Sequence, residues 1–114
     1  MPSKKNKENI SLRNKVAIVT GAGSGIGKAV ALSLVEEGFN VYLIGRSRDK
    51  LLKTNKIICE DKKTYIGDSH PFKCDVSTEK DVKKLFLEVK KKYNRLDLLF
   101  NNAGIGISPT SIDN

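Results

Sequence analysis

Thr20-Gly21-Ala22-Gly23-Ser24-Gly25-Ile26-Gly27 is the stretch of this 114-residue chain that decides its fold. It follows a run of branched apolar residues at 16–19, typical of a buried strand, and precedes a run of good helix formers at 28–35. Glycines between a strand and a helix leave backbone N–H groups unpaired at the positive end of the helix dipole, where anions bind. We therefore predict that this loop holds the pyrophosphate of a dinucleotide.

The spacing of these glycines distinguishes between two kinds of dinucleotide-binding loop. The common Gly-x-Gly-x-x-Gly pattern does not fit, because counting from Gly21 places Ile26 where the third glycine belongs. The chain instead has Thr-Gly-x-x-x-Gly-Ile-Gly, with glycines at 21, 25 and 27, and at these residues it resembles the short-chain dehydrogenase/reductase family. A flexible glycine loop between two ordinary elements is the alternative interpretation.

Segments that favour strands alternate with segments that favour helices. Strands are expected at residues 15–20, 40–44, 72–74 with an exit at 75–76, and 97–101. Helices are expected at 25–37, at 48–60 and after Ser77 or Thr78, which would cap the last helix, while 62–71 forms a polar connection. This alternation predicts an α/β fold, a Rossmann-type doubly wound parallel sheet in the order 3-2-1-4, truncated after strand 4. Its crevice should lie between strands 1 and 4.

Apolar spacing predicts which side of each helix packs on the sheet. A stripe that recurs every three or four residues is expected to face inward. The expected inward residues are Ile26, Val30 and Leu34 in the first helix, with Leu32 and Val35 widening the stripe, Leu51, Leu52, Ile58 and Cys59 in the second, and Val82, Leu85, Phe86, Val89 and Tyr93 in the third.

The exit of the second strand should select the coenzyme. An NAD site has an Asp or Glu about 20 residues past the glycine loop, which binds the adenosine ribose hydroxyls. Gly45 stands there instead and Arg46 follows, and a guanidinium pairs with a 2′-phosphate through two charge-assisted hydrogen bonds. Gly-Arg here also resembles the NADP-preferring members of the family, so we predict NADP, with NAD as the alternative and with Ser24 and Ser47 as secondary donors. A solvated arginine at a helix start is the competing interpretation.

The resemblance covers approximately residues 14–107 and implies further coenzyme contacts. Asp75 and Val76 would frame the adenine ring, and the segment 101–104, Asn-Asn-Ala-Gly, would support the sheet and reach the ribose on the nicotinamide side. A carboxylate at a helix entry and a plain Asn-Gly-type loop are the respective alternatives. The predicted coenzyme-binding residues are Gly21, Ser24, Gly25, Ile26, Gly27, Arg46, Asp75, Val76, Asn102, Ala103 and Gly104.

The resemblance also implies a reaction. The family transfers hydride between a nicotinamide coenzyme and a carbonyl/alcohol pair, using a tyrosine, a lysine four residues after it and an upstream serine. None of the tyrosines here, at 42, 65 and 93, has a lysine at that distance, so we expect no catalytic residue in this chain. The resemblance therefore implies that the chain is the coenzyme-binding half of a longer NADP(H)-dependent oxidoreductase, and we expect it to be inactive by itself. A non-catalytic dinucleotide-binding or sensing module is the alternative.

The amino-acid composition bears on nucleic-acid binding, metal binding and cellular location. The formal net charge is +8, but the lysines are interleaved with acids and lack an aromatic pattern, which favours a solvated surface over nucleic-acid binding. We expect a disordered basic tail at 1–13 and a partial NAD(P)-binding Rossmann domain at 14–114. Cys59 and Cys74 lack metal-ligand spacing, so we expect reduced thiols, no metal site and a cytoplasmic location. No membrane segment is expected, and the full-length form is expected to be a homo-oligomer acting on a small carbonyl or alcohol.

Overall fold

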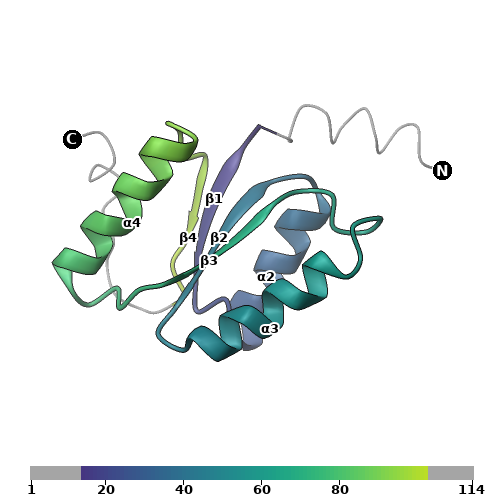
Figure 1. Cartoon of the computed structure of the whole chain (residues 1–114), viewed down its shortest axis with the longest axis horizontal. Coiled ribbons are helices and arrows are strands. Elements are labelled where there is room, and N and C mark those ends of the chain that lie inside the picture. Colours follow the sequence, from purple (N-terminus) through teal and green to yellow (C-terminus); the bar gives the residue numbers. More distant parts are fainter. Residues whose placement is uncertain (1–13, 103–114) are drawn as a thin grey trace.

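In the computed structural model, which describes residues 14–102, four parallel strands form one sheet in the order β3-β2-β1-β4 (Figure 1). The elements are β1 (Val16–Thr20), α2 (Gly25–Glu36), β2 (Asn40–Gly45), α3 (Arg48–Cys59), β3 (Ser69–Lys73), α4 (Glu79–Lys92) and β4 (Leu98–Phe100). The predicted fold class and strand order are confirmed. The tail predicted at 1–13 lies outside the described residues.

The helices cover both faces of this sheet, with α4 on one side and α2 and α3 on the other (Figure 1). Successive residues of the central strand β1 alternate between the two layers, as the pleat requires. Val16 and Ile18 pack with the apolar residues of α4, while Ala17 and Val19 pack with those of α2 and α3. All four are fully buried, which explains why β1 reads as a continuous apolar run.

The predicted inward stripe of α2 was partly wrong: Val35 is buried, and Val30, Leu32 and Leu34 pack against the core as partly buried residues. Ile26 is 66% exposed, and the residues that α2 buries are Gly27, Ala31 and Val35. A Cβ atom at position 27 would lie 2.1 Å from the Gly21 carbonyl oxygen, so the helix meets the loop on its glycine side. The close approach of helix and loop therefore sets the rotation of α2, and the larger apolar residues lie beside the contact.

The predicted inward face of α3 was partly wrong. Leu51 and Ile58 are buried as expected, but Leu52 is 40% exposed and Cys59 is exposed. The third inward position is Thr54, a polar residue that is completely buried. Positions 51, 54 and 58 fit the helical period. The prediction missed Thr54 because it considered only apolar residues for the inward face.

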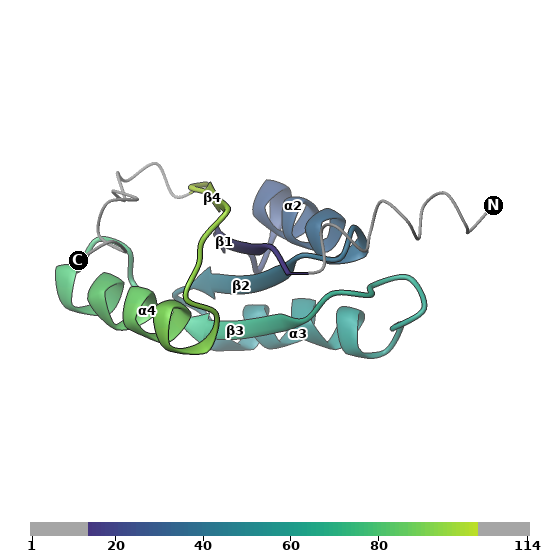
Figure 2. The same cartoon turned by 90° about the horizontal axis from the view of Figure 1, so that it is seen from above.

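Strand β3 begins earlier than predicted. The sequence predicts a polar connection at residues 62–71, yet Ser69–Lys73 pairs in parallel with β2, with Pro71 opposite Leu43. Proline is tolerated there because β3 is an edge strand, which needs hydrogen-bond donors on one side only. Figure 2 shows the sheet from above, with β3 at one edge and β4 beside β1 at the other. In α4 the predicted period holds, since Leu85, Phe86 and Val89 are its buried residues.

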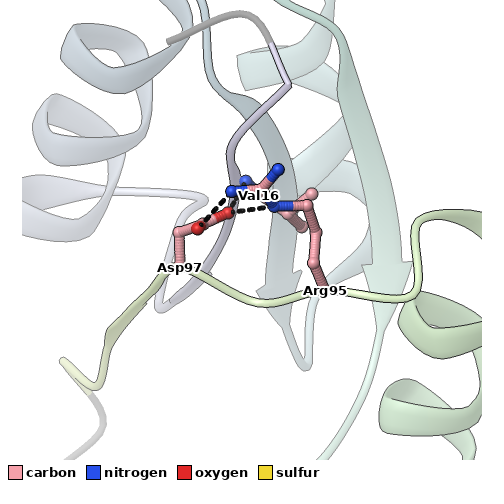
Figure 3. A network of polar contacts seen from close by, with 3 residues as sticks. All are labelled: Val16, Arg95 and Asp97. Atoms are coloured by element: carbon pink, nitrogen blue, oxygen red, sulfur yellow. Dashed lines mark hydrogen bonds and ion pairs between the residues drawn. The ribbon is translucent and has the colours of Figure 1, made fainter. Parts of the chain in front are cut away.

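A polar junction joins the start of β1 to the chain entering β4 (Figure 3). The Val16 N–H donates to Asp97 Oδ2 at 2.8 Å, and the Asp97 N–H donates back to the Val16 carbonyl at 2.8 Å. Arg95 donates to both carboxylate oxygens, from Nε at 2.8 Å and from Nη2 at 2.7 Å. These hydrogen bonds, led by those from Arg95, lower the pKa of Asp97 below its ordinary value of 3.8.

We expect Asp97→Asn to destabilise the protein at neutral pH by about 1 kcal/mol, the scale of a partly exposed bidentate ion pair. A depressed pKa in the folded state contributes stability above the unfolded value, and this contribution disappears as the pH falls through the folded value. The difference between wild type and variant should therefore shrink below about pH 3.8. Urea unfolding from pH 7 to pH 2 measures it.

Glu60→Gln is the matched control for this prediction. Glu60 lies 3.9 Å from Lys56 Nζ, with both side chains largely exposed, so its loss should change the unfolding free energy by less than about 0.5 kcal/mol. Coincident pH profiles for Asp97→Asn and wild type would show that the junction contributes nothing to stability.

Candidate functional site

The carboxyl ends of all four parallel strands lie at the same end of the sheet, and a pocket of about 300 Å³ opens there. The crevice was predicted between strands 1 and 4, where the strand order reverses, whereas this pocket extends from β1 toward β2 and β3 and has no lining residue from β4. The pocket receives residues from the loops after β1, β2 and β3. Its lining consists of Thr20, Gly21, Ile44, Gly45, Arg46, Cys74, Asp75, Val76 and Ser77.

A second pocket of about 210 Å³ adjoins the first between the glycine loop and the start of α3. It is lined by Gly21, Gly23, Ser24, Gly45, Arg46, Ser47, Lys50 and Leu51. Arg46 borders both pockets, and Lys50 adds a second cation to the smaller one. Nothing in the sequence analysis singled out Lys50, although its place one turn into a helix that starts beside Arg46 could have indicated it.

The glycine loop has the backbone that its sequence requires. Gly21 and Gly25 have φ values of +66° and +56°, a left-handed conformation that other residues adopt at a cost. Gly27 serves the close packing of α2 already described. The predicted residue Ser24, the N-cap of α2, is exposed and lines the second pocket, and the predicted residue Ile26, in the first turn of α2, is also exposed.

The β4 end of the sheet supports the glycine loop directly. The Asn102 N–H donates to the Thr20 hydroxyl at 2.7 Å, and that hydroxyl lies within donating distance, 3.2 Å, of Asn101 Oδ1. Asn102 Nδ2 is 3.0 Å from the position a Cβ atom would take at Gly21. The structure therefore brings the predicted residue Asn102 against the loop, 82 positions from Thr20. The predicted residues Ala103 and Gly104 lie outside the described part of the chain.

Two residues of opposite charge, Asp75 and Arg46, line the first pocket. Asp75 accepts hydrogen bonds from the Ser77 N–H at 3.0 Å and from the Ser77 hydroxyl at 2.6 Å. These bonds, with a smaller contribution from Arg46, hold the pKa of Asp75 below 3.8. An anionic Asp75 and the cationic Arg46 therefore face the same pocket, one suited to an amine and the other to an anion.

Two other ionisable groups are unsuited to chemistry at this site. Burial raises the pKa of Cys74 to about 11, so the pocket wall carries a neutral thiol. His70 belongs to the α4 layer, where Nε2 lies 2.5 Å from the Tyr93 hydroxyl oxygen. Across residues 14–102 no group of three or more His, Cys, Asp or Glu side chains could hold a metal ion.

Comparisons with known proteins show which family this sequence matches. The family described as short chain dehydrogenase matches residues 15–113. A 3beta-hydroxysteroid dehydrogenase of Mediterraneibacter gnavus is 41% identical over 97 residues, which is 84% of this chain and 34% of that protein. Dehydrogenase/reductase SDR family member 1 of Homo sapiens is 37% identical over 84% of this chain and 30% of its own length.

Solved structures give the same result. L-sorbose reductase from Gluconobacter frateurii, complexed with NADPH and L-sorbose, has a TM-score of 0.71 at 31% identity, over 84% of this chain and 35% of that one. NAD⁺-bound xylitol dehydrogenase has a TM-score of 0.71 at 35% identity, over 82% of this chain and 35% of that one. The chain thus spans about a third of the length of these relatives.

Within residues 14–102, no helix is long and apolar enough to cross a bilayer.

Proposed function

This chain belongs to the short chain dehydrogenase family, and from that premise we propose that it is the coenzyme-binding part of an NADP(H)-dependent oxidoreductase. The full-length protein would transfer hydride between the nicotinamide ring and a small carbonyl or alcohol. The observation that carries the proposal is the position of Arg46, which follows β2 and borders two adjoining pockets beside the glycine loop.

Different groups of residues would bind different parts of the proposed coenzyme. The glycine loop, with Gly21, Gly25 and Gly27, would hold the pyrophosphate against the N-terminus of α2. Asp75 and Val76 would meet the adenine ring in the first pocket. The second pocket would take the phosphate on the adenosine ribose. Asn102, with Ala103 and Gly104 after it, would reach the nicotinamide side.

The choice of NADP over NAD rests on charge. Gly45 ends β2 where an NAD site would place a carboxylate, so nothing at that position repels a 2′-phosphate. Arg46 and Lys50 line the second pocket together and supply two cations beside it. The Ser47 hydroxyl accepts from the Lys50 N–H at 3.4 Å as the cap of α3, while its own proton stays available to a phosphate oxygen.

The proton needed for hydride chemistry has no source among the described tyrosines. A catalytic tyrosine works with a lowered pKa, whereas burial raises the pKa of Tyr42 above its usual range and that of Tyr93 to about 12. Both pack in the α4 layer, the third described tyrosine, Tyr65, packs in the α2 and α3 layer, and none of the three lines either pocket. We therefore assign the proton donor to sequence other than residues 14–102, and we propose that this chain alone has no turnover.

We expect Arg46→Ala to weaken NADPH binding to the full-length gene product by about 1.5–3 kcal/mol, because a charged hydrogen-bonding partner of the 2′-phosphate is lost. NADH lacks that phosphate, so its dissociation constant should change less than about twofold. Titration of coenzyme fluorescence with both reduced coenzymes measures the two constants.

Arg48→Ala is the matched control, because Arg48 is exposed two residues along and lines neither pocket. It should leave both constants within about twofold, apart from a small long-range charge effect. Equal losses for NADPH and NADH in Arg46→Ala would refute the 2′-phosphate role. A wild-type protein that binds neither coenzyme would refute the proposed function itself.

A further inference from the structure

Thr54 is a buried polar side chain that connects α3 to the glycine loop. Its hydroxyl donates to the Ala22 carbonyl oxygen at 3.0 Å, across 32 positions of sequence, and the residue has no exposed surface. The Lys50 carbonyl, one turn earlier in the same helix, lies at the longer distance of 3.4 Å. The shorter bond to the loop is therefore the better partner for the single hydroxyl proton.

The peptide that receives this bond is one that could readily turn over. Rotating the Ala22–Gly23 peptide changes mainly ψ of residue 22 and φ of residue 23, and glycine tolerates the positive φ that results. A larger residue cannot remove this freedom, because a Cβ atom at position 23 would lie 2.6 Å from Lys50 Cβ. The loop thus needs glycine for packing, and something else must fix its peptide orientation.

Two hydrogen bonds hold Ala22 on its α3 and β2 side. Its N–H donates to the Ile44 carbonyl at 3.1 Å, and its carbonyl accepts from Thr54. In a trans peptide the N–H and C=O point in opposite directions, so fixing the Ala22 carbonyl toward α3 turns the Gly23 N–H away from Thr54. Gly23 lines the second pocket, beside Ser24 and Arg46.

We infer that Thr54 is a positioning residue for the coenzyme: its hydroxyl fixes the Ala22–Gly23 peptide in the orientation that the dinucleotide binds. Thr54 acts through this peptide and does not line either pocket. The inference rests on the proposed function, because it assumes that a dinucleotide occupies these pockets. A loop held in one orientation loses less conformational freedom on binding, so removing the hydroxyl lowers affinity.

The test compares Thr54→Val, which keeps the shape and removes the donor, with Thr54→Ser, which keeps the donor, in the full-length gene product. We expect Thr54→Val to raise the NADPH dissociation constant about five- to tenfold, the scale of one neutral hydrogen bond, and Thr54→Ser to stay within about twofold of wild type. Binding is measured well below each melting temperature, so that only folded protein is compared. The amide resonance of Gly23 should move in Thr54→Val and return in Thr54→Ser.

Ile58→Val separates positioning from stability. Ile58 is buried in the same layer one turn further along α3, so losing a methyl group lowers stability by about the amount expected for Thr54→Val. Its coenzyme affinity should equal that of wild type. If Thr54→Val binds NADPH as tightly as Ile58→Val, the positioning role is wrong and the proposed function stands. If wild type binds no dinucleotide, the proposed function fails first and the inference falls with it.

Discussion

Gly27→Ala is expected to raise the NADPH dissociation constant more than about 100-fold and to lower the unfolding free energy by about 3 kcal/mol or more. The added Cβ atom would lie 2.1 Å from the Gly21 carbonyl oxygen, 2.6 Å from its carbon and 2.9 Å from the Thr20 carbonyl oxygen. All three atoms are backbone, so no side chain can move aside. Either α2 shifts away from β1 or the glycine loop changes shape, and both outcomes dismantle the proposed pyrophosphate site.

Gly25→Ala is the control that isolates the clash. No heavy atom lies within 4 Å of a Cβ atom at position 25, so the cost there comes from the φ of +56° alone, about 1–2 kcal/mol for an L-residue. Guanidinium unfolding and coenzyme titration of both variants give the comparison. Near-normal coenzyme binding by Gly27→Ala would contradict the structure at the contact between α2 and the loop.

Gly67→Ala is expected to lower the unfolding free energy by about 3 kcal/mol or more while leaving the affinity of the folded protein for NADPH within about twofold. Gly67 is buried in the connection from α3 to β3, where it packs against the chain between α2 and β2, and its N–H donates to the Val35 carbonyl at 3.0 Å. A Cβ atom there would lie 2.0 Å from the Phe39 carbonyl oxygen, a clash as severe as that at Gly27. Gly67 lines neither pocket, so the damage should be confined to stability.

Lys62→Ala provides the comparison for Gly67. The Lys62 ammonium donates to the Gly67 carbonyl at 2.5 Å from a largely exposed position, so its removal should cost about 1 kcal/mol or less. Thermal unfolding and coenzyme titration of the two variants distinguish the clash from the lost hydrogen bond. A Gly67→Ala protein as stable as wild type, or one that stays folded but loses NADPH, would overturn this prediction.

The sequence was informative where one physical requirement dominates. The alternation of buried strands with helices, together with the glycine turn, was enough to predict the order β3-β2-β1-β4 and the meeting of Gly21, Arg46, Asp75 and Asn102 at one edge. These residues converge because parallel strands all end on the same side. That convergence requires only that the strands run parallel, which their alternation with helices predicts.

Three details could not be predicted because they depend on contacts between distant segments. The face of α2 is set by the approach of Gly27 to Gly21, which no hydrophobic count includes. Thr54 is buried because it has a carbonyl acceptor on the glycine loop, a partner known only after folding. The early start of β3 was missed because Pro71 argues against a strand until its place at the sheet edge is known.

The pairing between β1 and β4 predicts which strand separates first from the sheet when the folded protein opens locally. Three residue pairs hold β4 in register with β1, whereas five hold β1 to β2, so among the described strands β4 is the one whose detachment gives up the fewest ladder bonds. When β4 separates, Asn102 leaves the Thr20 hydroxyl and the glycine loop loses its support on that side. Amide exchange at this strand and coenzyme release would then report one shared equilibrium.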